Sequence, residues 1–510
     1  MIDKKNFQHH NNVHENHEYE NRKKKLMKIR KNGFSFPNNF QTNTNITKIN
    51  EKYNCITNHE LKKKSILVNI IGRITNQRIM GKASFVNIKS TIEEIQIYVT
   101  EKKISSEIYQ KKFKKLDIGD IIGVTGILFK TKTKQLSIYC ENIILLSKSL
   151  RPLPDKFHGL SNQEIKYRKR YLDLLSSKNT MKIFYTRSKI LMLIREFMHR
   201  NDFIEVETPM MQNIPGGATA RPFITYHNTL DMKMYLRVSP ELYLKRLIIG
   251  GFERIYEINR NFRNEGISSK HNPEFTMMEL YIAHANYQDL ILFITNLLRS
   301  IIKTIYGSHT LQYQKNILYF QKPFPVLTMK NAIIHYNPNI QKNHLSNLEQ
   351  AKKISILYEI PIKKTWTLGK IIAKIFECTT EKKLIQPTFI TEYPIEISPL
   401  ARRNNIKKNI ADRFELFMGG IEIANGFSEL NDPEDQKKRF LNKQNIKYQD
   451  NPKKILYDIE YIEAMEYGMP PTAGLGIGID RLIMIITNQD SIRDVILFPT
   501  LRTLQNTDHK

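Results

Sequence analysis

The stretch ERIYEINRNFRNEG (253–266) has side chains suited to binding an anion. At a period of two, one face of a strand here is almost wholly polar and carries Ile255, Glu257, Asn259, Asn261, Arg263 and Glu265. A strand in a large domain rarely shows so many hydrogen-bonding groups unless a polar ligand lies over them. Arg263 could clamp an anionic oxygen with its fork of donors. A sheet surface that only meets water is the alternative.

The next run, HNPEFTMMELY (271–281), alternates in the same way. One face carries Phe275, Met277, Glu279 and Tyr281. We expect the two runs to form an antiparallel pair joined by a loop. Phe275 would then offer an aromatic plane for a nucleobase, and Glu279 a carboxylate.

A second hairpin is predicted for DRFELFMGGIEIANGFSEL (412–430). If Gly419 and Gly420 form a two-residue turn, Phe417 lies opposite Glu422, and Glu415 is the diagonal neighbour of Glu422 on the same face. Two carboxylates at this separation can share a hard cation bound to phosphate oxygens, which suits Mg²⁺. An exposed acidic pair without a metal is the alternative.

The third element is PPTAGLGIGIDRLIM (470–484). Three glycines, Gly474, Gly476 and Gly478, permit close backbone approach, and Arg481 opens an apolar helix. Together with Arg263, Phe275 and the carboxylate pair, this turn predicts a nucleotide triphosphate site. The chain has neither GxxxxGK[ST] nor a GxGxxG placed in a βαβ unit, so a P-loop or a Rossmann site is not supported.

Other elements must position these groups. Residues 180–200 have Ile183, Ile190, Ile194 and Phe197 at helical spacing, and the strand-like FIEVETP (203–209) follows. Helices and long antiparallel-looking β segments then alternate irregularly from 161 to 500. The pattern predicts an α+β domain with an antiparallel sheet and flanking helices.

Residues 65–150 have a different pattern. Five β-rich runs and a longer helical insert at 103–116 predict a five-stranded Greek-key barrel of the oligonucleotide-binding (OB) type. Such barrels bind single strands by stacking bases on aromatic side chains. Arg78, Phe85 and Gln96 are candidates for charge, stacking and base-edge contact. Each is, taken singly, also compatible with an ordinary strand residue.

The charge supports a polyanionic partner. The 510 residues carry a net charge of +29, and residues 1–150 alone have 28 basic and 13 acidic side chains. A basic helix over 15–31 is predicted within this region. Codon bias of an AT-rich genome could add lysines, although bias would spread them evenly. No apolar run reaches the ~20 residues that span a bilayer, and the N-terminus lacks a secretory h-region. Three scattered cysteines suggest a reducing compartment. We therefore expect a cytoplasmic protein without membrane contact.

The predicted organisation has six parts. They are a disordered tail (1–14), a basic helical extension (15–64), the OB barrel (65–150), a linker (151–178), the large α+β domain (179–502) and a C-terminal tail (503–510).

FIEVETP, FRNEG with HNPEFTMMELY, and GLGIGIDR resemble the three motifs of class II aminoacyl-tRNA synthetases, in order. The barrel, with QRIMGKASF (77–85), resembles the anticodon-binding domain of the aspartyl, asparaginyl and lysyl subgroup. QNIPGGATARPF (212–223), SPELYLKRL (239–247) and NGFSELND (425–432) resemble the bacterial lysyl enzymes in particular. The resemblance implies ATP-dependent activation of lysine, transfer to tRNA(Lys), Mg²⁺ as cofactor and a homodimer.

The resemblance also implies roles for matching residues. Arg263 and Arg481 would be catalytic, at the α- and γ-phosphates of ATP. The implied ATP-binding residues are Arg263, Glu265, His271, Asn272, Phe275 and Arg481, and the implied metal ligands are Glu415 and Glu422. The implied lysine pocket consists of Gly217, Glu241, Glu279, Tyr281, Asn425, Phe427 and Glu429. The anticodon would lie on Arg78, Phe85 and Gln96.

Two rivals remain at this level. One is an aspartyl- or asparaginyl-tRNA synthetase of the same subgroup, against which two glutamates in the amino-acid pocket argue, or a lysyl transferase acting on a protein, which would not need a barrel to read an anticodon. The other is a catalytically dead tRNA-binding protein, which would be expected to have lost Arg263, Glu415, Glu422 or Arg481. Two positions depart from the family pattern: Ala424 stands where glycine is usual, and Asn142 where a glutamate is usual.

Overall fold

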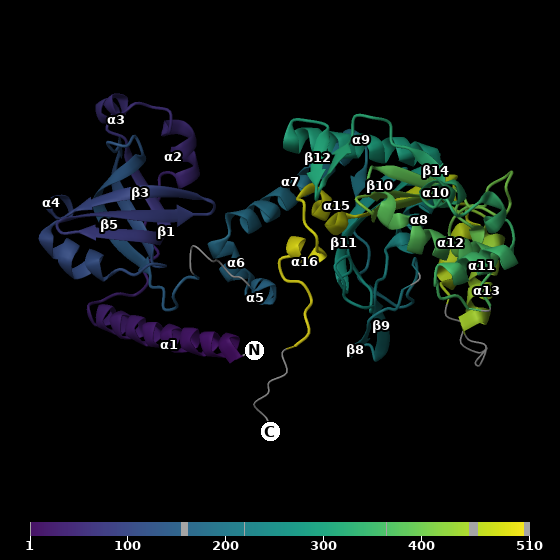
Figure 1. Cartoon of the computed structure of the whole chain (residues 1–510), viewed down its shortest axis with the longest axis horizontal. Helices are drawn as coiled ribbons and strands as arrows, with labels where there is room; N and C mark the ends of the chain where they lie inside the picture. Colours follow the sequence, from purple (N-terminus) through teal and green to yellow (C-terminus); the bar gives the residue numbers. More distant parts are fainter. Residues whose placement is uncertain (1, 155–161, 219, 364, 448–456, 504–510) are drawn as a thin grey trace, which may run out of the picture. The chain divides into compact units, whose positions relative to one another are not determined.

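The computed structural model describes residues 2–154, 162–218, 220–363, 365–447 and 457–503. It divides into two compact units, residues Met1–Lys182 and Ile183–Lys510. Figure 1 shows a barrel in the first unit, from purple to blue, and a large sheet with helices in the second. The predicted α+β class with an N-terminal barrel is confirmed.

The first unit is built on a closed five-stranded barrel with strand order β1-β2-β3-β5-β4. Its strands are β1 (Leu67–Met80), β2 (Ala83–Ser90), β3 (Glu93–Thr100), β4 (Ile121–Lys130) and β5 (Leu136–Ser147). Every second residue points inward, so Val86, Ile88, Ile97 and Val99 are buried in one apolar core. All five predicted β-rich runs correspond to these strands.

Helical segments surround the barrel. The predicted insert at 103–116 corresponds to α4 (Glu101–Ile104), a π-helical turn (Ile108–Lys112) and a 3₁₀ turn (Phe113–Lys115). The predicted extension contains α1 (Ile2–Lys31), α2 (Ile46–Tyr53) and α3 (Asn58–Lys64). The helix α1 is longer than the predicted 15–31 and takes in most of the segment expected to be disordered, since no glycine or proline interrupts the chain before Gly33.

Two basic residues of α1 fasten it to the barrel. Arg22 is buried and donates to the Ile118 and Ser149 carbonyls at 2.9 and 3.2 Å. The Lys25 ammonium lies 2.5 Å from the Asp117 carboxylate, which also pairs with the buried Lys148. Part of the positive charge of the helix therefore serves folding, while Lys24, Lys28, Arg30 and Lys31 remain exposed.

The second unit is organised around an eight-stranded sheet with strand order β14-β15-β16-β17-β18-β11-β10-β6. Its strands are β14 (Val326–Thr328), β15 (Thr388–Thr391), β16 (Arg413–Met418), β17 (Ile421–Ser428), β18 (Thr472–Gly478), β11 (Glu274–Ala283), β10 (Arg254–Phe262) and β6 (Ile204–Glu205). Only the outer pairs β14–β15 and β6–β10 are parallel. The predicted strand 203–209 is thus reduced to two residues at the sheet edge.

One face of this sheet is apolar. Met278 and Leu280 of β11, Leu475 and Ile477 of β18, and Leu416 of β16 belong to a single buried cluster. Residues of α7 (Lys178–Arg200), α9 (Tyr287–Tyr306) and α15 (Ile479–Ile486) complete that cluster. The alternate residues of the same strands point to the opposite face, where the candidate site lies. Ala424 faces the apolar cluster, so its methyl group does not enter the site.

The remaining elements of this unit cover the sheet and its ends. The helices are α8 (Glu241–Ile249), α10 (Met329–Tyr336), α11 (Leu348–Leu357), α12 (Leu368–Thr379), α13 (Pro433–Lys447), α14 (Ile459–Glu466) and α16 (Ile492–Val495), with 3₁₀ turns at Lys342–Leu345, Glu381–Lys383 and Ile395–Ile397. Two small sheets contain β7 (Met211–Gln212), β9 (Met232–Leu236) and β8 (Ile224–His227), and β12 (Thr310–Tyr313) with β13 (Asn316–Tyr319).

Two predicted boundary segments differ or lie outside the described residues. The linker 151–178 contains two short helices, α5 (Gln163–Arg168) and α6 (Arg170–Ser176), and its residues 155–161 are not described. The C-terminal tail, apart from Thr503, also lies outside the described residues. In the described part of the chain, no helix has the length and apolar character needed to cross a bilayer.

Candidate active site

The strands β10 and β11 form the predicted antiparallel pair. Asn261 lies opposite Phe275, and Glu257 lies opposite Glu279. Arg263 follows at the start of the connecting loop, where its guanidinium stands over the Phe275 ring, 5.0 Å from the centroid. A cation and an aromatic plane are thus adjacent, as recognition of an adenine joined to phosphates requires.

The glycines of β18 lie between these groups and the second hairpin. Gly476 pairs with Glu279 on one side and with Asn425 on the other, and Gly474 pairs with Tyr281 and Phe427. A Cβ on Gly474 would lie 2.0 Å from a Glu429 oxygen. Because Gly474 has no side chain, Glu429 and Tyr281 can pack directly against the backbone of β18.

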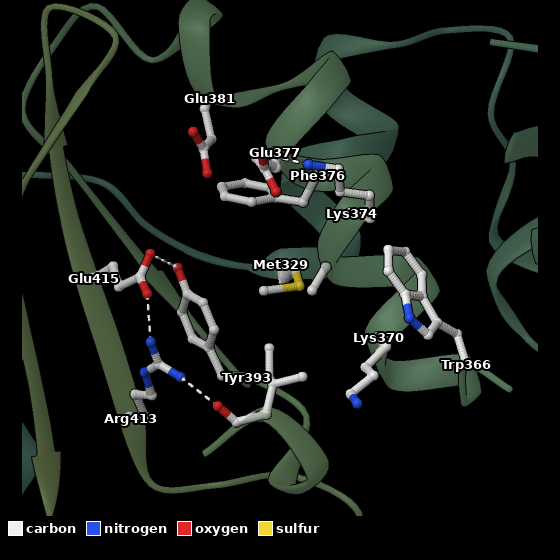
Figure 2. Close-up of a pocket in the computed structure, with 12 residues that line it drawn as sticks. Met329, Trp366, Lys370, Lys374, Phe376, Glu377, Glu381, Tyr393, Arg413 and Glu415 are labelled. Carbon is white, nitrogen blue, oxygen red and sulfur yellow. Dashed lines mark hydrogen bonds and ion pairs between the residues drawn. The ribbon is translucent and has the colours of Figure 1, made fainter. Parts of the chain in front are cut away.

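The carboxylates Glu415 and Glu422 come from the predicted hairpin, whose turn is Gly419–Gly420. Phe417 pairs with Glu422 as expected, and a bulge sets Glu415 opposite Asn425. The Glu415 carboxylate accepts from the Tyr393 hydroxyl at 2.7 Å and from Arg413 Nη2 at 2.5 Å. It lines a pocket of about 400 Å³, and Figure 2 shows these residues around it. Burial, partly opposed by Arg413, raises the pKa of Glu415. The neighbouring Glu422 carboxylate raises it further, because two like charges on this face repel each other.

Arg481, in the first turn of α15, joins the second carboxylate to the loop after β10. Its Nη1 lies 3.0 Å from Glu422, and its Nη2 lies 3.1 Å from His271 Nε2. Burial and then Arg481 lower the pKa of His271, so a neutral imidazole accepts from Arg481. Glu265 is exposed, on the same loop as Arg263.

Asn272 is placed differently from the other predicted ATP-binding residues. Its Nδ2 donates to the Glu274 carbonyl at 2.7 Å, and its Oδ1 accepts from the Thr500 amide at 3.2 Å. Both ends of the amide are therefore engaged with the protein backbone, which holds the loop. Its ATP contact stays a prediction.

The groups predicted to bind an amino acid form one buried, mostly acidic cluster. Ser239 donates to Glu279 at 2.9 Å, and Tyr281 to Glu279 at 3.3 Å. Burial and then Glu241 raise the pKa of Glu279 to about 7. Glu241 and Glu429 both form ion pairs with Lys245, whose ammonium stands over the Phe427 ring.

Gly217 closes one side of this pocket. Its φ is +84°, and a Cβ there would lie 3.0 Å from Ser239 and 3.1 Å from Glu241. Asn425 accepts from Arg413 Nε at 3.0 Å, next to Glu415. Apart from Asn272, the predicted amino-acid, nucleotide and metal residues therefore lie on one face of the sheet or on the loops and helices beside it.

Several buried polar atoms on this face have no hydrogen-bond partner among the described residues. They are Nδ2 and Oδ1 of Asn261, Oδ1 of Asn259 and Nε of Arg263. Leaving such groups unpaired costs about 1–3 kcal/mol each. A polar ligand would satisfy them, so their arrangement favours a binding site over a sheet surface that only meets water.

The predicted nucleic-acid residues lie on the outer face of the barrel. Arg78 pairs with Phe85, Phe85 with Tyr98, and Tyr98 with Tyr139 across four strands. The rings of Phe85 and Tyr98 are 4.9 Å apart, and those of Tyr98 and Tyr139 are stacked at 5.6 Å. Ser137 fixes Gln96 with a hydrogen bond of 3.2 Å. Half-buried aromatic rings beside an exposed arginine suit stacking on unpaired bases.

Comparison with known proteins agrees with both sites. Residues 162–502 match the family described as "tRNA synthetases class II (D, K and N)". Residues 68–146 match "OB-fold nucleic acid binding domain". The chain belongs to the class II tRNA synthetases.

Curated relatives are similar over nearly the whole chain. The lysine–tRNA ligase of Buchnera aphidicola subsp. Schizaphis graminum is 61% identical over 95% of this chain and 96% of its own length. The lysine–tRNA ligase of Blochmanniella pennsylvanica is 56% identical, over 94% of this chain and 95% of its own. The heat-inducible lysine–tRNA ligase of Escherichia coli (strain K12) is 53% identical, over 96% of each.

Sequence reasoning missed several residues of this class II tRNA synthetase. Asp480 is buried, accepts from the Thr276 amide at 2.7 Å and pairs with Arg187 at 2.6 Å, which orients the turn that carries Arg481. Tyr98 and Tyr139 extend the aromatic surface of the barrel. Lys245 follows Glu241 by four residues on α8, a spacing that could have pointed to their contact.

Replacing Asn261 by leucine tests whether this face of the synthetase is built for a ligand. Without ligand, we expect the free energy of unfolding to rise by about 1–2 kcal/mol, because two unpaired buried polar atoms are removed. The shift of the urea midpoint caused by ATP and Mg²⁺ should shrink. Fluorescence of Trp366, the single tryptophan, reports both quantities.

Asn337→Leu is the matched control. Asn337 is also buried, but its amide donates to Ile333 and Thr380 at 2.8 and 3.1 Å. This variant should lose about 1–3 kcal/mol and keep the ATP response. Equal destabilisation in both variants would contradict a ligand role for Asn261.

Proposed function

We propose that this class II tRNA synthetase is a lysine–tRNA ligase. It activates lysine with ATP to give lysyl-adenylate and pyrophosphate, and then transfers the lysyl group to the 3′-terminal adenosine of tRNA(Lys). The observation that supports this proposal most strongly is a cluster of three buried carboxylates at the amino-acid end of the site, Glu241, Glu279 and Glu429. The relatives named lysine–tRNA ligase support the same assignment.

The charge of the pocket discriminates between the substrates of the subgroup. An aspartate side chain would be repelled by the three glutamates, and burying it there without a cation is costly. Asparagine would leave carboxylates without counter-charge. A lysine side chain supplies an ammonium that pairs with them, and the Tyr281 hydroxyl, next to Glu279, offers a further polar contact.

The order of residues along β18 fits a ligand with an amino-acid end and a nucleotide end. Gly474 lies beside Tyr281 and Phe427, Gly476 beside Glu279 and Asn425, and Gly478 next to Arg481. Four residues of a strand span roughly 13 Å. In this arrangement the lysine side chain lies at the Gly474 end, and the phosphates lie at the Gly478 end.

Activation is an in-line attack of the lysine carboxylate on the α-phosphorus of ATP. No general base is needed, because the carboxylate is ionised at neutral pH. Arg263 neutralises charge at the α-phosphate while its aromatic neighbour Phe275 holds the adenine. Arg481 holds the γ-phosphate, fixed in place by Glu422 and His271. Positioning and charge stabilisation supply the acceleration.

Glu415 and Glu422 are the residues that would hold Mg²⁺. Two carboxylates leave most of the octahedral shell to water and phosphate oxygens, which is the usual arrangement for this ion. Mg²⁺ would supply charge neutralisation at the phosphates. Arg413 and Tyr393 keep the Glu415 carboxylate aimed at the shared face.

The barrel face with Arg78, Phe85 and Gln96 is proposed to hold the anticodon of tRNA(Lys). Tyr98 and Tyr139 extend the stacking surface. Asn142, at the position where the family usually has glutamate, is exposed on β5, and the adjacent Glu141 pairs with Lys103 at 2.8 Å. A catalytically dead tRNA-binding protein is disfavoured, because Arg263, Arg481, Glu415 and Glu422 stand on one face with their supporting contacts.

A homodimer is the proposed assembly. The first class II motif and the elements next to it expose large apolar side chains: Tyr185 and Met192 on α7, Ile204 on β6 and Met211 on β7. Exposed apolar groups beside an open sheet edge are typical of a protein interface. Light scattering should give about twice the 60.1 kDa of one chain. A monomeric mass would contradict the dimer.

The proposed activity predicts pyrophosphate exchange with ATP that depends on lysine. Among the twenty amino acids, lysine should give the strongest exchange, and strong exchange with another amino acid would overturn the substrate assignment. Arg263→Ala should lower the exchange rate by about 10²–10³-fold, as removal of one transition-state donor does. Arg254→Ala, at the far end of the same strand, is the control and should leave the rate near wild type.

Phe85→Leu tests the barrel separately from the catalytic unit. Leucine keeps the bulk but removes the stacking surface, which is worth about 1–3 kcal/mol per base. We expect KM for tRNA in aminoacylation to rise by about 5- to 100-fold. Pyrophosphate exchange without tRNA should not change. An unchanged KM for tRNA would show that this face does not contact the anticodon.

A further inference from the structure

Lys245 is a completely buried lysine behind the amino-acid pocket. Its ammonium lies 2.5 Å from Glu241, one turn earlier on α8, and forms a second ion pair with Glu429, just after β17. The Phe427 ring lies 5.5 Å away on one side. The buried Tyr461 of α14 also borders it, and its hydroxyl has no hydrogen-bond partner among the described residues.

A purely structural role explains this lysine poorly. Taking a lysine and two carboxylates out of water is costly, and apolar residues of similar size often stabilise a fold as well or better. One ammonium also cannot balance this cluster, because Glu279 adds a third buried carboxylate. The cluster therefore holds three acidic groups and a single basic group.

We propose that Lys245 is a resident counter-ion that sets the charge of the amino-acid pocket. It neutralises one of the three carboxylates and leaves two for the two ammonium groups of free lysine. The carboxylate of that lysine pairs with Arg263 instead. With substrate bound, three carboxylates thus meet three ammonium groups. Lys245 is a positioning and specificity residue that acts through Glu241 and Glu429, and this inference rests on the proposed function.

The pKa shifts of Lys245 and the surrounding carboxylates are consistent with three carboxylates that pair with three ammonium groups. Burial alone would lower the pKa of Lys245, but Glu241 and Glu429 raise it above its usual value, so Lys245 stays charged. Burial raises the pKa of Glu279 to about 7 and that of Glu429 well above its usual value. Without substrate Glu279 is therefore partly protonated at neutral pH, and the ammonium groups of lysine displace that proton.

The other titratable groups around Lys245 do not supply a further positive charge. Tyr281 and Tyr461 have pKa values raised by burial and stay neutral. Asp458, at the start of α14, is paired with Arg246 at 2.5 Å. Arg263 is a cation that lowers the pKa of Glu279 from the nucleotide side, but in this proposal its charge pairs with the carboxylate of the substrate. Lys245 lowers the pKa of Glu429, so replacing it by a neutral residue raises that pKa, and lysine binding needs a higher pH.

The test measures lysine binding by calorimetry between pH 6 and 9, with the full-length protein and its Lys245→Met and Lys245→Arg variants. At pH 7 Lys245→Met should bind lysine at least about tenfold more weakly, which corresponds to one pKa unit, and much of this loss should disappear by pH 9. Proton release on binding, measured in buffers of different ionisation enthalpy, should increase at pH 7. Lys245→Arg keeps the charge and should retain the wild-type pH profile.

A second substitution separates charge from packing. Lys245→Met with Glu241→Gln again leaves two carboxylates for two ammonium groups, so the double variant should bind lysine at pH 7 more tightly than Lys245→Met alone. Should Lys245→Met fail to fold, Lys245→Gln makes the same charge change and its amide can still bond both carboxylates. A loss that is equal at every pH, or a double variant weaker than the single one, would overturn the inference.

Failure of the proposed function gives a different result. In that case the wild-type protein itself shows no lysine-dependent pyrophosphate exchange. A wild-type protein that binds and activates lysine, with variants whose pH profile is unchanged, would reject only the role of Lys245.

Discussion

Along the central strands, successive side chains point alternately to the two faces of the sheet, and the rest of the second unit depends on this constraint. Each of β10, β11, β16, β17 and β18 sends every second side chain into the apolar cluster under α7, α9 and α15. The intervening side chains must then lie on the other face, and there they are mainly arginine, glutamate, asparagine and glycine. Burying charge on this face is tolerable only because carboxylates and guanidinium groups pair with one another or with a ligand.

Within this face the charges are separated along the strand direction. Carboxylates dominate beside Gly474, whereas Arg263, Arg481 and His271 lie toward Gly478. Each guanidinium of the nucleotide end has a partner that limits its movement, such as Glu422 for Arg481 and the ring of Phe275 for Arg263. A site of this kind is preorganised, so little reorganisation accompanies the reaction.

The barrel strands show the same alternation of side chains, here between the apolar interior and the outer surface. Its inward residues close a small apolar core, and its outward residues line up Phe85, Tyr98 and Tyr139 across adjacent strands. Basic residues of α1 divide between two tasks, since Arg22 and Lys25 fasten the helix while Lys24 and Lys28 remain exposed. The charge of the N-terminal region is therefore only partly available to a nucleic acid.

Patterns of a few neighbouring residues in the sequence were sufficient to predict much of this fold. The five barrel strands, the β10–β11 pair and the turn at Gly419–Gly420 follow from alternation and turn residues, which act over a few residues. The extent of α1 and the two helices in the expected linker did not follow. Where polar residues carry neither a stop signal nor a periodicity, propensity alone does not decide between helix and coil.

The order of residue types along the chain was enough to predict which residues share a face of a strand. The motifs were enough to indicate the family and the kinds of side chain in the site. The sequence by itself could not show that Lys245 pairs with Glu429, that Asp480 orients the turn of Arg481, or that Asn272 is held by the backbone near Thr500. These contacts join residues far apart in the chain, and only the packing of α8, α15 and the sheet brings them together. The net charge of the amino-acid pocket is the sum of the charged groups that surround it. These groups come from distant parts of the chain, so only the tertiary structure decides whether positive and negative charges balance there.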